Sequence, residues 1–274
     1  MKASKDLIKM NDDDIKKELV KTLAFFDKIC TKNRINYSLI GGSLIGAVRH
    51  KGIIPWDDDI DVAMAPEELE KLKTALSKEK EAPYKLLIPN TNGYYYPFCK
   101  LVSTNTVLDE LQQKDIPDYG VFIDIFTYHN ISSDKKAQKK FYKKYFRYHT
   151  GIYTTAAEHK AWPRNPRHRF KYIWYNYIAK ANYTQKMLDL YNSLPKEATG
   201  FLVSSDPTYG IERDVISSEW TTDFIRVPFE NIEASIYKEY DNILRTVFGD
   251  YMQLPPEEER KPHHFYNAYY KSKK

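Results

Sequence analysis

The stretch Gly41-Gly42-Ser43-Leu44-Ile45-Gly46-Ala47-Val48-Arg49-His50, followed by Pro55-Trp56-Asp57-Asp58-Asp59-Ile60-Asp61-Val62, decides the fold. It combines a glycine turn, the start of a helix and a cluster of aspartates set among apolar residues. Carboxylates this close together repel one another, so such a cluster is either fully solvated or neutralised by a cation. Because the flanking residues are apolar, we expect a divalent metal site rather than a solvated acidic loop.

The spacing of the aspartates indicates which carboxylates meet. Residues 60–64 are typical of a short buried strand, in which alternate side chains share a face. We therefore expect Asp59 and Asp61 to point together, and Asp57 to join them where the extended backbone reaches back past the tryptophan. Asp58 should face away.

An EF-hand calcium loop is the main competing interpretation of the aspartates, because Asp57, Asp59, Asp61 and Glu68 have its ligand spacing. The match fails at two positions. Val62 stands where the sharp turn of the loop needs glycine, and Pro55 excludes an entering helix. We therefore reject the calcium loop.

The glycine pair indicates a second function for the motif. Residues 35–40 are typical of a strand that ends at Gly41-Gly42, and Ser43 is a suitable N-cap for a helix through Val48. Such a turn presents backbone N–H groups to an anion, although an isolated Gly-Gly is more often a simple strand-to-helix turn. Gly42 and Ser43 are thus candidates for holding a phosphate beside the metal.

These residues resemble a known pattern. Gly42-Ser43 followed by Asp59-Ile60-Asp61 is similar to the signature of the nucleotidyltransferase fold, whose third carboxylate lies on a later strand, where Asp124 fits within residues 120–126. The run from Gly41 to Asp61 more specifically resembles the LicD family. Further segments resemble that family: Tyr96–Leu101, Phe248–Met252, Leu254–Glu257 and His263–His264.

The resemblance implies a fold and an activity. The fold would be α/β, with a nucleotidyltransferase-like mixed sheet and flanking helices. Characterised LicD members are phosphocholine transferases that decorate bacterial cell-surface glycans, and fukutin-related ribitol-phosphate transferases are distant relatives. The implied reaction moves phosphocholine from CDP-choline to a hydroxyl of a glycan precursor, such as teichoic acid or lipopolysaccharide, and releases CMP. Transfer of ribitol phosphate, or of a nucleoside monophosphate to a small hydroxyl acceptor, is the alternative.

The same resemblance implies roles for individual residues. Asp59, Asp61 and Asp124 would bind Mg²⁺ or Mn²⁺, and either Asp57 or Asp124 would take the proton from the acceptor hydroxyl. Arg49 or Lys100 would neutralise a phosphate oxygen, unless each is an ordinary structural or surface charge.

Two further groups of residues are candidates for substrate contacts. His263 and His264 would contact donor or acceptor, with ordinary surface or core imidazoles as the equal alternative. A quaternary ammonium donates no hydrogen bond and is held by aromatic faces. The aromatic candidates for that role are Tyr94, Tyr95, Tyr96 and Trp220.

Composition sets the limits of the architecture. With 274 residues, 42% of them hydrophobic, the chain can bury a substantial core, and we expect a catalytic core over residues 1–133 and a mainly helical half over residues 134–274. Cys30 and Cys99 are expected to be buried thiols of a cytoplasmic protein. The absence of a long apolar run and of a signal-peptide core predicts a cytoplasmic location without a membrane-spanning helix.

The second half is strongly basic. Between Lys135 and Lys186 there are 14 Lys and Arg but only one acid, interleaved with 13 aromatic residues. Much of this pattern fits a helical core with a solvated outside, and no nucleic-acid-binding module is recognisable. The remaining charge suits the inner face of a membrane or a polyprenyl-pyrophosphate-linked glycan acceptor, with Arg164, Arg167 and Arg169 as candidate contacts.

The periodicity of apolar residues predicts the order of elements. Helices are expected at 11–34, 43–48, 66–77, 134–148, 167–179, 184–194 and 229–247. Strands are expected at 35–40, 60–64, 84–88, 95–102, 106–110, 121–126, 201–204 and 224–228.

Overall fold

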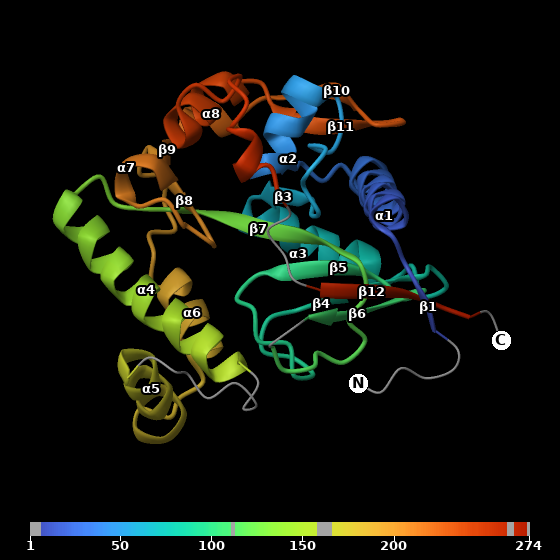
Figure 1. Cartoon of the computed structure of the whole chain (residues 1–274). Helices are drawn as coiled ribbons and strands as arrows, with labels where there is room; N and C mark the ends of the chain where they lie inside the picture. Colours follow the sequence, from blue (N-terminus) through green and yellow to red (C-terminus); the bar gives the residue numbers. More distant parts are fainter. Residues whose placement is uncertain (1–6, 111–112, 158–165, 262–265, 273–274) are drawn as a thin grey trace.

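The computed structural model describes residues 7–110, 113–157, 166–261 and 266–272 and shows a mixed α/β fold (Figure 1). The α-helices are α1 (Asp12–Asn33), α2 (Gly41–Ile45), α3 (Pro66–Leu76), α4 (Lys135–Ala156), α5 (Pro166–Ile173), α6 (Tyr183–Asn192), α7 (Ile211–Asp214) and α8 (Tyr240–Phe248). The strands are β1 (Leu7–Lys9), β2 (Ser38–Leu39), β3 (Asp61–Met64), β4 (Tyr84–Leu87), β5 (Cys99–Ser103), β6 (Thr106–Glu110), β7 (Phe122–Asn130), β8 (Phe201–Ser204), β9 (Val215–Ser217), β10 (Phe224–Phe229), β11 (Ile232–Tyr237) and β12 (Tyr266–Lys271). The π-helical turns η1 (Gly46–His50) and η2 (Trp174–Ile178) continue α2 and α5, and η3 (Ser218–Thr221) and η4 (Glu257–Glu259) are 3₁₀ turns.

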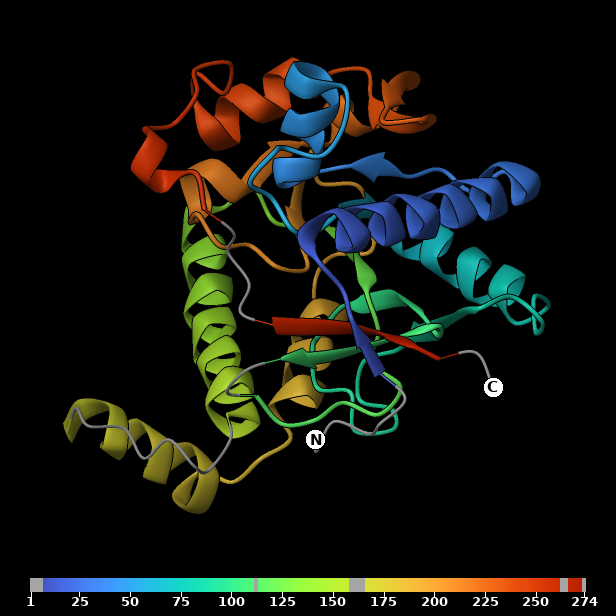
Figure 2. The same ribbon diagram turned by 45° about the vertical axis from the view of Figure 1, so that its right-hand side comes forward.

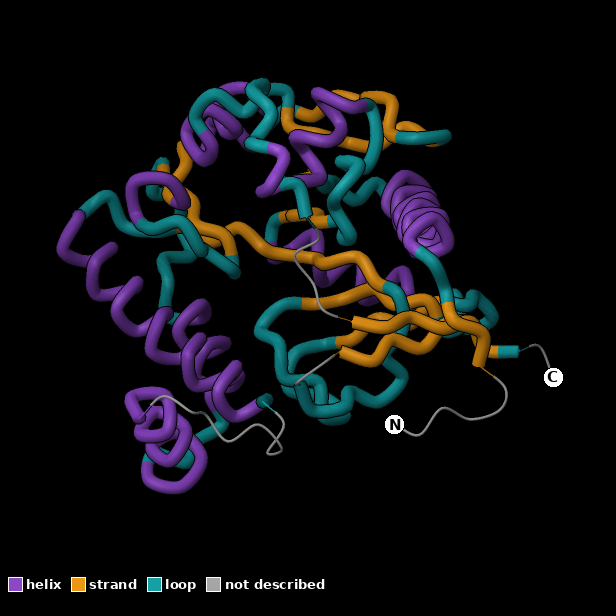
Figure 3. The backbone as a smooth tube through the Cα atoms, viewed as in Figure 1, coloured by secondary structure: helices purple, strands orange, loops and turns teal. Residues whose placement is uncertain are grey.

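A mixed sheet with the order β2-β3-β7-β5-β4 forms the centre of the fold (Figures 1 and 3). β3 and β7 run parallel, whereas the other neighbours run antiparallel. β7 is long enough to continue past β3 and β5, and its last three residues pair with β8, which in turn pairs with β9. The first part of β7 is buried throughout, as expected of a central strand covered on both faces. The α/β class with a mixed sheet is therefore confirmed.

Helix α1 packs on this sheet along several of its strands. Asn11 and Asp14 form a reciprocal capping box at its start, and the acidic first turn complements the helix dipole. Its apolar stripe, including Leu19, Leu23 and Phe26, is almost completely buried. α1 packs against α3, β5 and β7, so both predicted amphipathic helices of the first half are confirmed and lie near the sheet (Figure 2).

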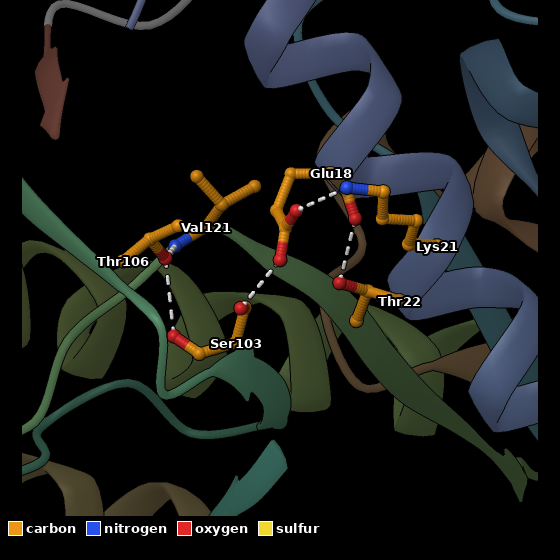
Figure 4. A network of polar contacts seen from close by, with 6 residues as sticks. All are labelled: Glu18, Lys21, Thr22, Ser103, Thr106 and Val121. Carbon is orange, nitrogen blue, oxygen red and sulfur yellow. Dashed lines mark hydrogen bonds and ion pairs between the residues drawn. The ribbon is translucent and has the colours of Figure 1, made fainter. Parts of the chain in front are cut away.

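A buried polar network fixes α1 to the sheet (Figure 4). Glu18 on α1 is only 4% exposed and accepts a hydrogen bond of 2.6 Å from the Ser103 hydroxyl at the end of β5. Thr106 Oγ1 accepts a hydrogen bond from the backbone N–H of Val121 and donates one to the carbonyl oxygen of Ser103. Because buried polar groups without partners are costly, this network specifies how α1 docks on β5.

Helices α4 and α6 pack against each other beside the far end of β7 (Figures 1 and 2). Their contact encloses a separate aromatic cluster that includes Phe141, Tyr145, Met187 and Tyr191. The three helices predicted in this region are confirmed, although the last turn of the second one is the π-helical η2. The predicted loop at 163–166 lies largely outside the described residues.

The predicted helix over 229–247 is wrong in its first half. Residues 224–237 form the antiparallel hairpin β10–β11, and only α8 is helical. Ala234 and Ile236 pack in the largest hydrophobic cluster, whereas Tyr237 packs in a different cluster, as expected of a strand that is buried on both faces. Glu230 adopts the left-handed conformation of the tight turn. The hairpin lies beside β2, where Ser38 and Tyr37 accept hydrogen bonds from its backbone.

Other expected strands are shorter or additional. The strand predicted at 35–40 is reduced to β2, and the one predicted at 95–102 begins only at Cys99, after Pro97 has interrupted the backbone pairing. β1 and β12 were not predicted. They form a small sheet of order β1-β12-β6 that brings both ends of the described chain together.

The largest hydrophobic cluster joins both halves of the sequence. It contains Leu23 and Val62 from the first half together with Phe229, Ile236 and Leu244 from the second. The division at residues 133 and 134 stays a prediction. Both cysteines are buried free thiols, as expected. Among the described helices, none has the length and apolar character needed to cross a bilayer.

Candidate active site

The glycine turn lies at the carboxyl-terminal end of β2 and begins α2. Gly41 has φ of +57°, a left-handed conformation that favours glycine, and starts the helix. Ser43 is not the N-cap, because Ile40 occupies that position without a side-chain hydrogen bond. The Ser43 hydroxyl is buried and accepts a hydrogen bond of 2.9 Å from the backbone N–H of Asp61. Ser43 therefore ties the turn directly to the first residue of β3.

Two carboxylates lie against the glycines. A Cβ atom at Gly42 would stand 2.6 Å from Asp57 Oδ2, and a Cβ atom at Gly41 would stand 3.4 Å from Asp61 Oδ2. A side chain at Gly42 would therefore displace Asp57. The unpaired N–H groups of a helix start favour negative charge nearby. The two halves of the motif thus meet in space as the sequence predicts.

Asp57, Asp58 and Asp59 form a tight acidic cluster. One carboxylate oxygen from each lies within 4.8 Å of the other two, a spacing that suits an oxygen-liganded divalent cation. The expectation that Asp58 faces away is wrong, because residues 57–60 precede β3 and do not follow strand alternation. Among the described residues the trio Asp59, Asp61 and Asp124 does not reach this close spacing.

The strand register places three charged residues side by side. Asp61 on β3 is opposite Asp124 on β7, and Asp124 is opposite Lys100 on β5. The Lys100 ammonium lies 2.5 Å from Asp124 Oδ1, with side-chain exposures of 4% and 8%. Asp61 and Asp124, although distant in sequence, are therefore neighbours, and Lys100 supplies the compensating charge.

The surroundings of Asp61 disfavour its ionised form. Burial raises its pKa well above the usual range, and the negative charges of Asp59, Asp124 and Asp57 raise it further, while Lys100 opposes them. A cation bound among these carboxylates would relieve that repulsion. All donors are carboxylate oxygens, which fits Mg²⁺ or Mn²⁺ and argues against a zinc-type site.

Lys100 is enclosed by aromatic rings. Its ammonium lies 3.4 Å from the ring centroid of Phe122, 5.0 Å from that of Tyr96 and 5.3 Å from that of Phe98. With its ion pair to Asp124, this leaves Lys100 in the protein interior. Lys100 therefore orients Asp124 and is not exposed at a surface that a phosphate could reach.

Arg49 makes contacts that the sequence did not predict. Its guanidinium donates hydrogen bonds to the carbonyl oxygens of Tyr251 (2.7 Å) and Gln253 (3.2 Å). Burial lowers its pKa, and the nearby charge of Arg260 adds to that effect. Arg49 thus links the first motif to the C-terminal segment that follows α8. His263 and His264, and also Arg164, lie outside the described residues.

A cavity of about 190 Å³ opens beside the glycine turn. Gly41, Gly42 and Asp61 contribute to its lining. The rest of the lining comes from β7, β8, the following loop and the segment from α7 to α8, and besides aliphatic side chains it includes two further carboxylates and several aromatic rings: Asp206, Asp214, Phe126, Tyr128, Tyr209 and Phe248.

The two additional carboxylates are held by tyrosines. Tyr145 donates a hydrogen bond of 2.5 Å to Asp206, and burial raises the pKa of Asp206 to about 6. Asp214 accepts hydrogen bonds from Tyr142 and from the backbone N–H of Gly210. Sequence analysis missed both aspartates. The signal for Asp206 was an acidic residue two positions after the strand predicted at 201–204, since side chains that follow the end of a strand often serve a site.

The predicted choline contacts lie elsewhere. Tyr94 and Tyr96 are 2% and 5% exposed and pack in the aromatic core around β5, together with the partly buried Tyr95. Trp220 packs against the cluster of Ile216, Tyr237 and Ile243. None of the four lines the cavity beside the glycine turn.

The chain is similar to known proteins along most of its length. Residues 34–155 match the family model described as "LicD/FKTN/FKRP, nucleotidyltransferase domain". The chain is 30% identical over 262 residues to the lipopolysaccharide cholinephosphotransferase LicD of Haemophilus influenzae, which covers 90% of this chain and 93% of that protein. A shorter match, 31% identical over 102 residues, covers 34% of the chain and 37% of the uncharacterized protein RP689 of Rickettsia prowazekii. The chain belongs to the LicD family.

Proposed function

We propose that this protein transfers phosphocholine from CDP-choline to a hydroxyl group of a cell-surface glycan, releases CMP, and requires Mg²⁺ or Mn²⁺. The observation that carries the proposal is the cavity that is lined by Gly41, Gly42 and Asp61 together with further aspartates and aromatic rings. The similarity to a cholinephosphotransferase over nearly the full length of both chains supports the choice of transferred group.

The acidic and aromatic residues that line the cavity suit the choline head group. A quaternary ammonium carries charge without a hydrogen-bond donor, so aromatic faces and carboxylates hold it best. The ring of Tyr209 contacts a cation in this structure, because the Arg213 guanidinium lies 4.5 Å from its centroid. Asp206 and Asp214 add negative charge, and their tyrosine partners fix their positions. A ribitol chain could donate hydrogen bonds to these carboxylates, but it lacks the positive charge that the carboxylates and aromatic rings together attract, so these residues favour a cationic alcohol.

The chemistry requires a carboxylate to accept a proton. The acceptor oxygen bonds to the phosphorus that carries choline, the bond from that phosphorus to the oxygen of CMP breaks, and the hydroxyl proton passes to the protein. A divalent cation, when bound, neutralises charge on the phosphate oxygens. Asp59 and Asp61 would hold it, with Asp57 or Asp124 completing the site.

Asp57 and Asp124 are the two candidates for the base, and their surroundings differ. Asp57 is partly exposed beside Gly42, whereas Asp124 is buried and paired with Lys100. Asp57→Asn and Asp124→Asn separate the roles. Loss of a metal ligand should raise the Mg²⁺ concentration needed for half-maximal rate, and loss of the base should lower turnover even at saturating Mg²⁺.

The acceptor would be a glycan precursor that offers a free hydroxyl group. The Haemophilus influenzae relative is named for lipopolysaccharide, and a lipopolysaccharide or teichoic acid precursor, joined to a polyprenyl pyrophosphate, would present the required hydroxyl. Such an acceptor is assembled at the inner face of the cell membrane, so we propose that the protein works in the cytoplasm at that face. Nucleic acid is not part of the proposal.

A product assay tests the proposed function. The protein is incubated with Mg²⁺, a glycan acceptor and one of three donors, namely CDP-choline, CDP-ribitol or CTP. We expect CMP from CDP-choline, no pyrophosphate from CTP, and no reaction for Asp59→Asn. Pyrophosphate released from CTP would assign nucleotidyl transfer instead, and preferential use of CDP-ribitol would change the transferred group.

A further inference from the structure

A second feature lies far from the cavity, on the helix formed by α5 and its π-helical continuation η2. Phe170, Ile173, Trp174, Tyr177 and Ile178 recur with the spacing of an apolar helix stripe. In a protein core such a stripe would be buried. Here their exposed fractions are 63%, 37%, 38%, 67% and 60% in that order, so the stripe faces outward. We call these five residues the α5 face.

The helix is held to the protein by its other side. Tyr172 is 7% exposed, and Asn176 donates hydrogen bonds to the carbonyl oxygens of Tyr172 and of Thr154 on α4. Tyr175 packs edge-on against Tyr183 of α6. The orientation of the α5 face is therefore set by defined contacts with α4 and α6. Figures 1 and 2 show the α5 helix projecting from the end of α4, away from the central sheet.

The charge around the α5 face has one sign. Residues 159–188 contain no Asp or Glu. Arg167, Arg169, Lys171 and Lys180 are exposed on the described part of this segment. On the neighbouring α4, Phe146 is 45% exposed beside the exposed Arg147. Aromatic and aliphatic side chains are thus surrounded by cations without acidic neighbours on the same segment.

We propose that the α5 face binds the surface of a membrane that contains anionic lipids. Trp, Tyr and Phe side chains would enter the boundary between head groups and acyl chains, and the surrounding Lys and Arg would contact lipid phosphates. A second copy of the chain is a poorer occupant, because a symmetric contact would bring these cations against one another. The proposal stands apart from the identity of the nucleotide donor.

Vesicle binding tests the proposal with the full chain. Wild-type protein should sediment with vesicles of phosphatidylglycerol and phosphatidylcholine, but not with phosphatidylcholine alone. Binding to the anionic vesicles should weaken as ionic strength rises from about 0.1 M to about 0.5 M. The tryptophan emission of the wild-type protein should shift to shorter wavelength on binding, and a variant that lacks Trp174 should lose this shift although the other three tryptophans remain.

Matched variants assign the binding to the α5 face. Trp174→Ser, Tyr177→Ser and Ile178→Ser combined should weaken vesicle binding by about tenfold or more. Ile8→Ser, at an apolar position of β1 that is 61% exposed, should leave it unchanged. Lys171→Glu with Lys180→Glu should act like the triple variant, whereas Lys17→Glu with Lys28→Glu on α1 should not. All variants should keep the wild-type melting temperature and CDP-choline binding.

Three results would overturn the proposal. The first is a wild-type protein that fails to bind anionic vesicles. The second is a triple variant that binds them as well as wild type. The third is a concentration-dependent dimer, measured by analytical ultracentrifugation, that the triple variant abolishes, because it would assign the α5 face to a second copy of the chain.

Discussion

Lys100 and Asp124 face each other across β5 and β7, with 2.5 Å between the lysine Nζ and the aspartate Oδ1, and both side chains are nearly inaccessible to water. On its other side Asp124 is paired in register with Asp61. The ion pair therefore places a carboxylate at the edge of the acidic cluster and supplies it with one permanent counter-charge. A bound divalent cation would add the charge that the remaining aspartates need.

Lys100→Met should destabilise the protein strongly. Removing one partner of a buried ion pair leaves an uncompensated charge, which costs about 3–5 kcal/mol. Lys85→Met is the matched control, because Lys85 pairs with Asp118 at the surface and that pair should contribute less than about 1 kcal/mol. Urea unfolding of both variants measures the difference. Similar losses for the two would show that the buried pair has no special energetic role.

Combining Lys100→Met with Asp124→Leu should recover much of the stability lost by Lys100→Met alone, because the double change removes both charges. The double variant should remain inactive. Recovered stability without recovered turnover would separate the structural role of the pair from the function of Asp124 in the site.

Gly42→Ala should lower turnover while preserving the fold. The new Cβ would meet Asp57 Oδ2 at 2.6 Å and push that carboxylate from its place, and misplacement of a reacting group by about 1 Å costs roughly 10²-fold in rate. Gly41→Ala is the informative comparison. Its left-handed backbone predicts a loss of about 1–2 kcal/mol in stability, with only an ordinary contact to Asp61.

Thermal unfolding and steady-state kinetics on both glycine variants measure these effects. Gly42→Ala should change kinetics more than stability, and Gly41→Ala should do the reverse. An active Gly42→Ala enzyme would mean that Asp57 does not need its position beside the turn.

Asp59→Asn and Asp61→Asn should each abolish turnover. The pKa of Asp61 is raised in the fold, so its charge at neutral pH opposes folding, and Asp61→Asn should raise the metal-free melting temperature. Mg²⁺ should stabilise the wild type, by about 2.7 kcal/mol at a hundredfold excess over its dissociation constant, and should stabilise both variants much less. EDTA should abolish the turnover of the wild-type enzyme, and added Mg²⁺ or Mn²⁺ should restore that turnover. Turnover within a few-fold of wild type in either variant would remove these aspartates from the metal site.

The sequence predicted the centre of the site because its signals are local. The glycine pair and the run of aspartates before β3 lie within about 20 residues of each other, and the Ser43 hydroxyl accepts a hydrogen bond from the backbone N–H of Asp61. Asp124 lay within reach of sequence reasoning because a charge between Ile123 and Ile125 on a buried strand requires a partner. That the partner is Lys100 followed only from strand order, since the pairing of β5 with β7 is not encoded in either strand alone.

The errors have physical causes of the same kind. Asp58 was expected to face away because strand alternation was extended to residues that precede β3. Residues 232–237 were expected in a helix, although they pair with β10 as β11 and four consecutive residues are buried. Asp206 follows β8, which pairs with β7, and Asp214 ends α7, which contacts α4 and α8. No local sequence pattern records that these tertiary contacts bring both aspartates to the cavity.

Asp206 should give the use of CDP-choline a dependence on pH. Burial raises its pKa to about 6, so the carboxyl is largely neutral below that pH and ionised above it. Only the ionised form attracts a quaternary ammonium. The KM for CDP-choline should therefore fall as pH rises from about 5 to about 8.

Asp206→Asn should flatten this dependence and leave KM high throughout. CDP-ribitol, which has no cationic head group, is the control for titration of the metal ligands, because its KM should respond equally in both proteins.

Stability supplies an independent readout. The native state holds the Asp206 proton more tightly than the unfolded chain, so the free energy of unfolding should fall as pH rises from about 4 to about 6, and this contribution should vanish in Asp206→Asn. If the KM for CDP-choline depends on pH in the same way in wild type and Asp206→Asn, Asp206 does not contact choline, even where the stability profiles of the two proteins differ.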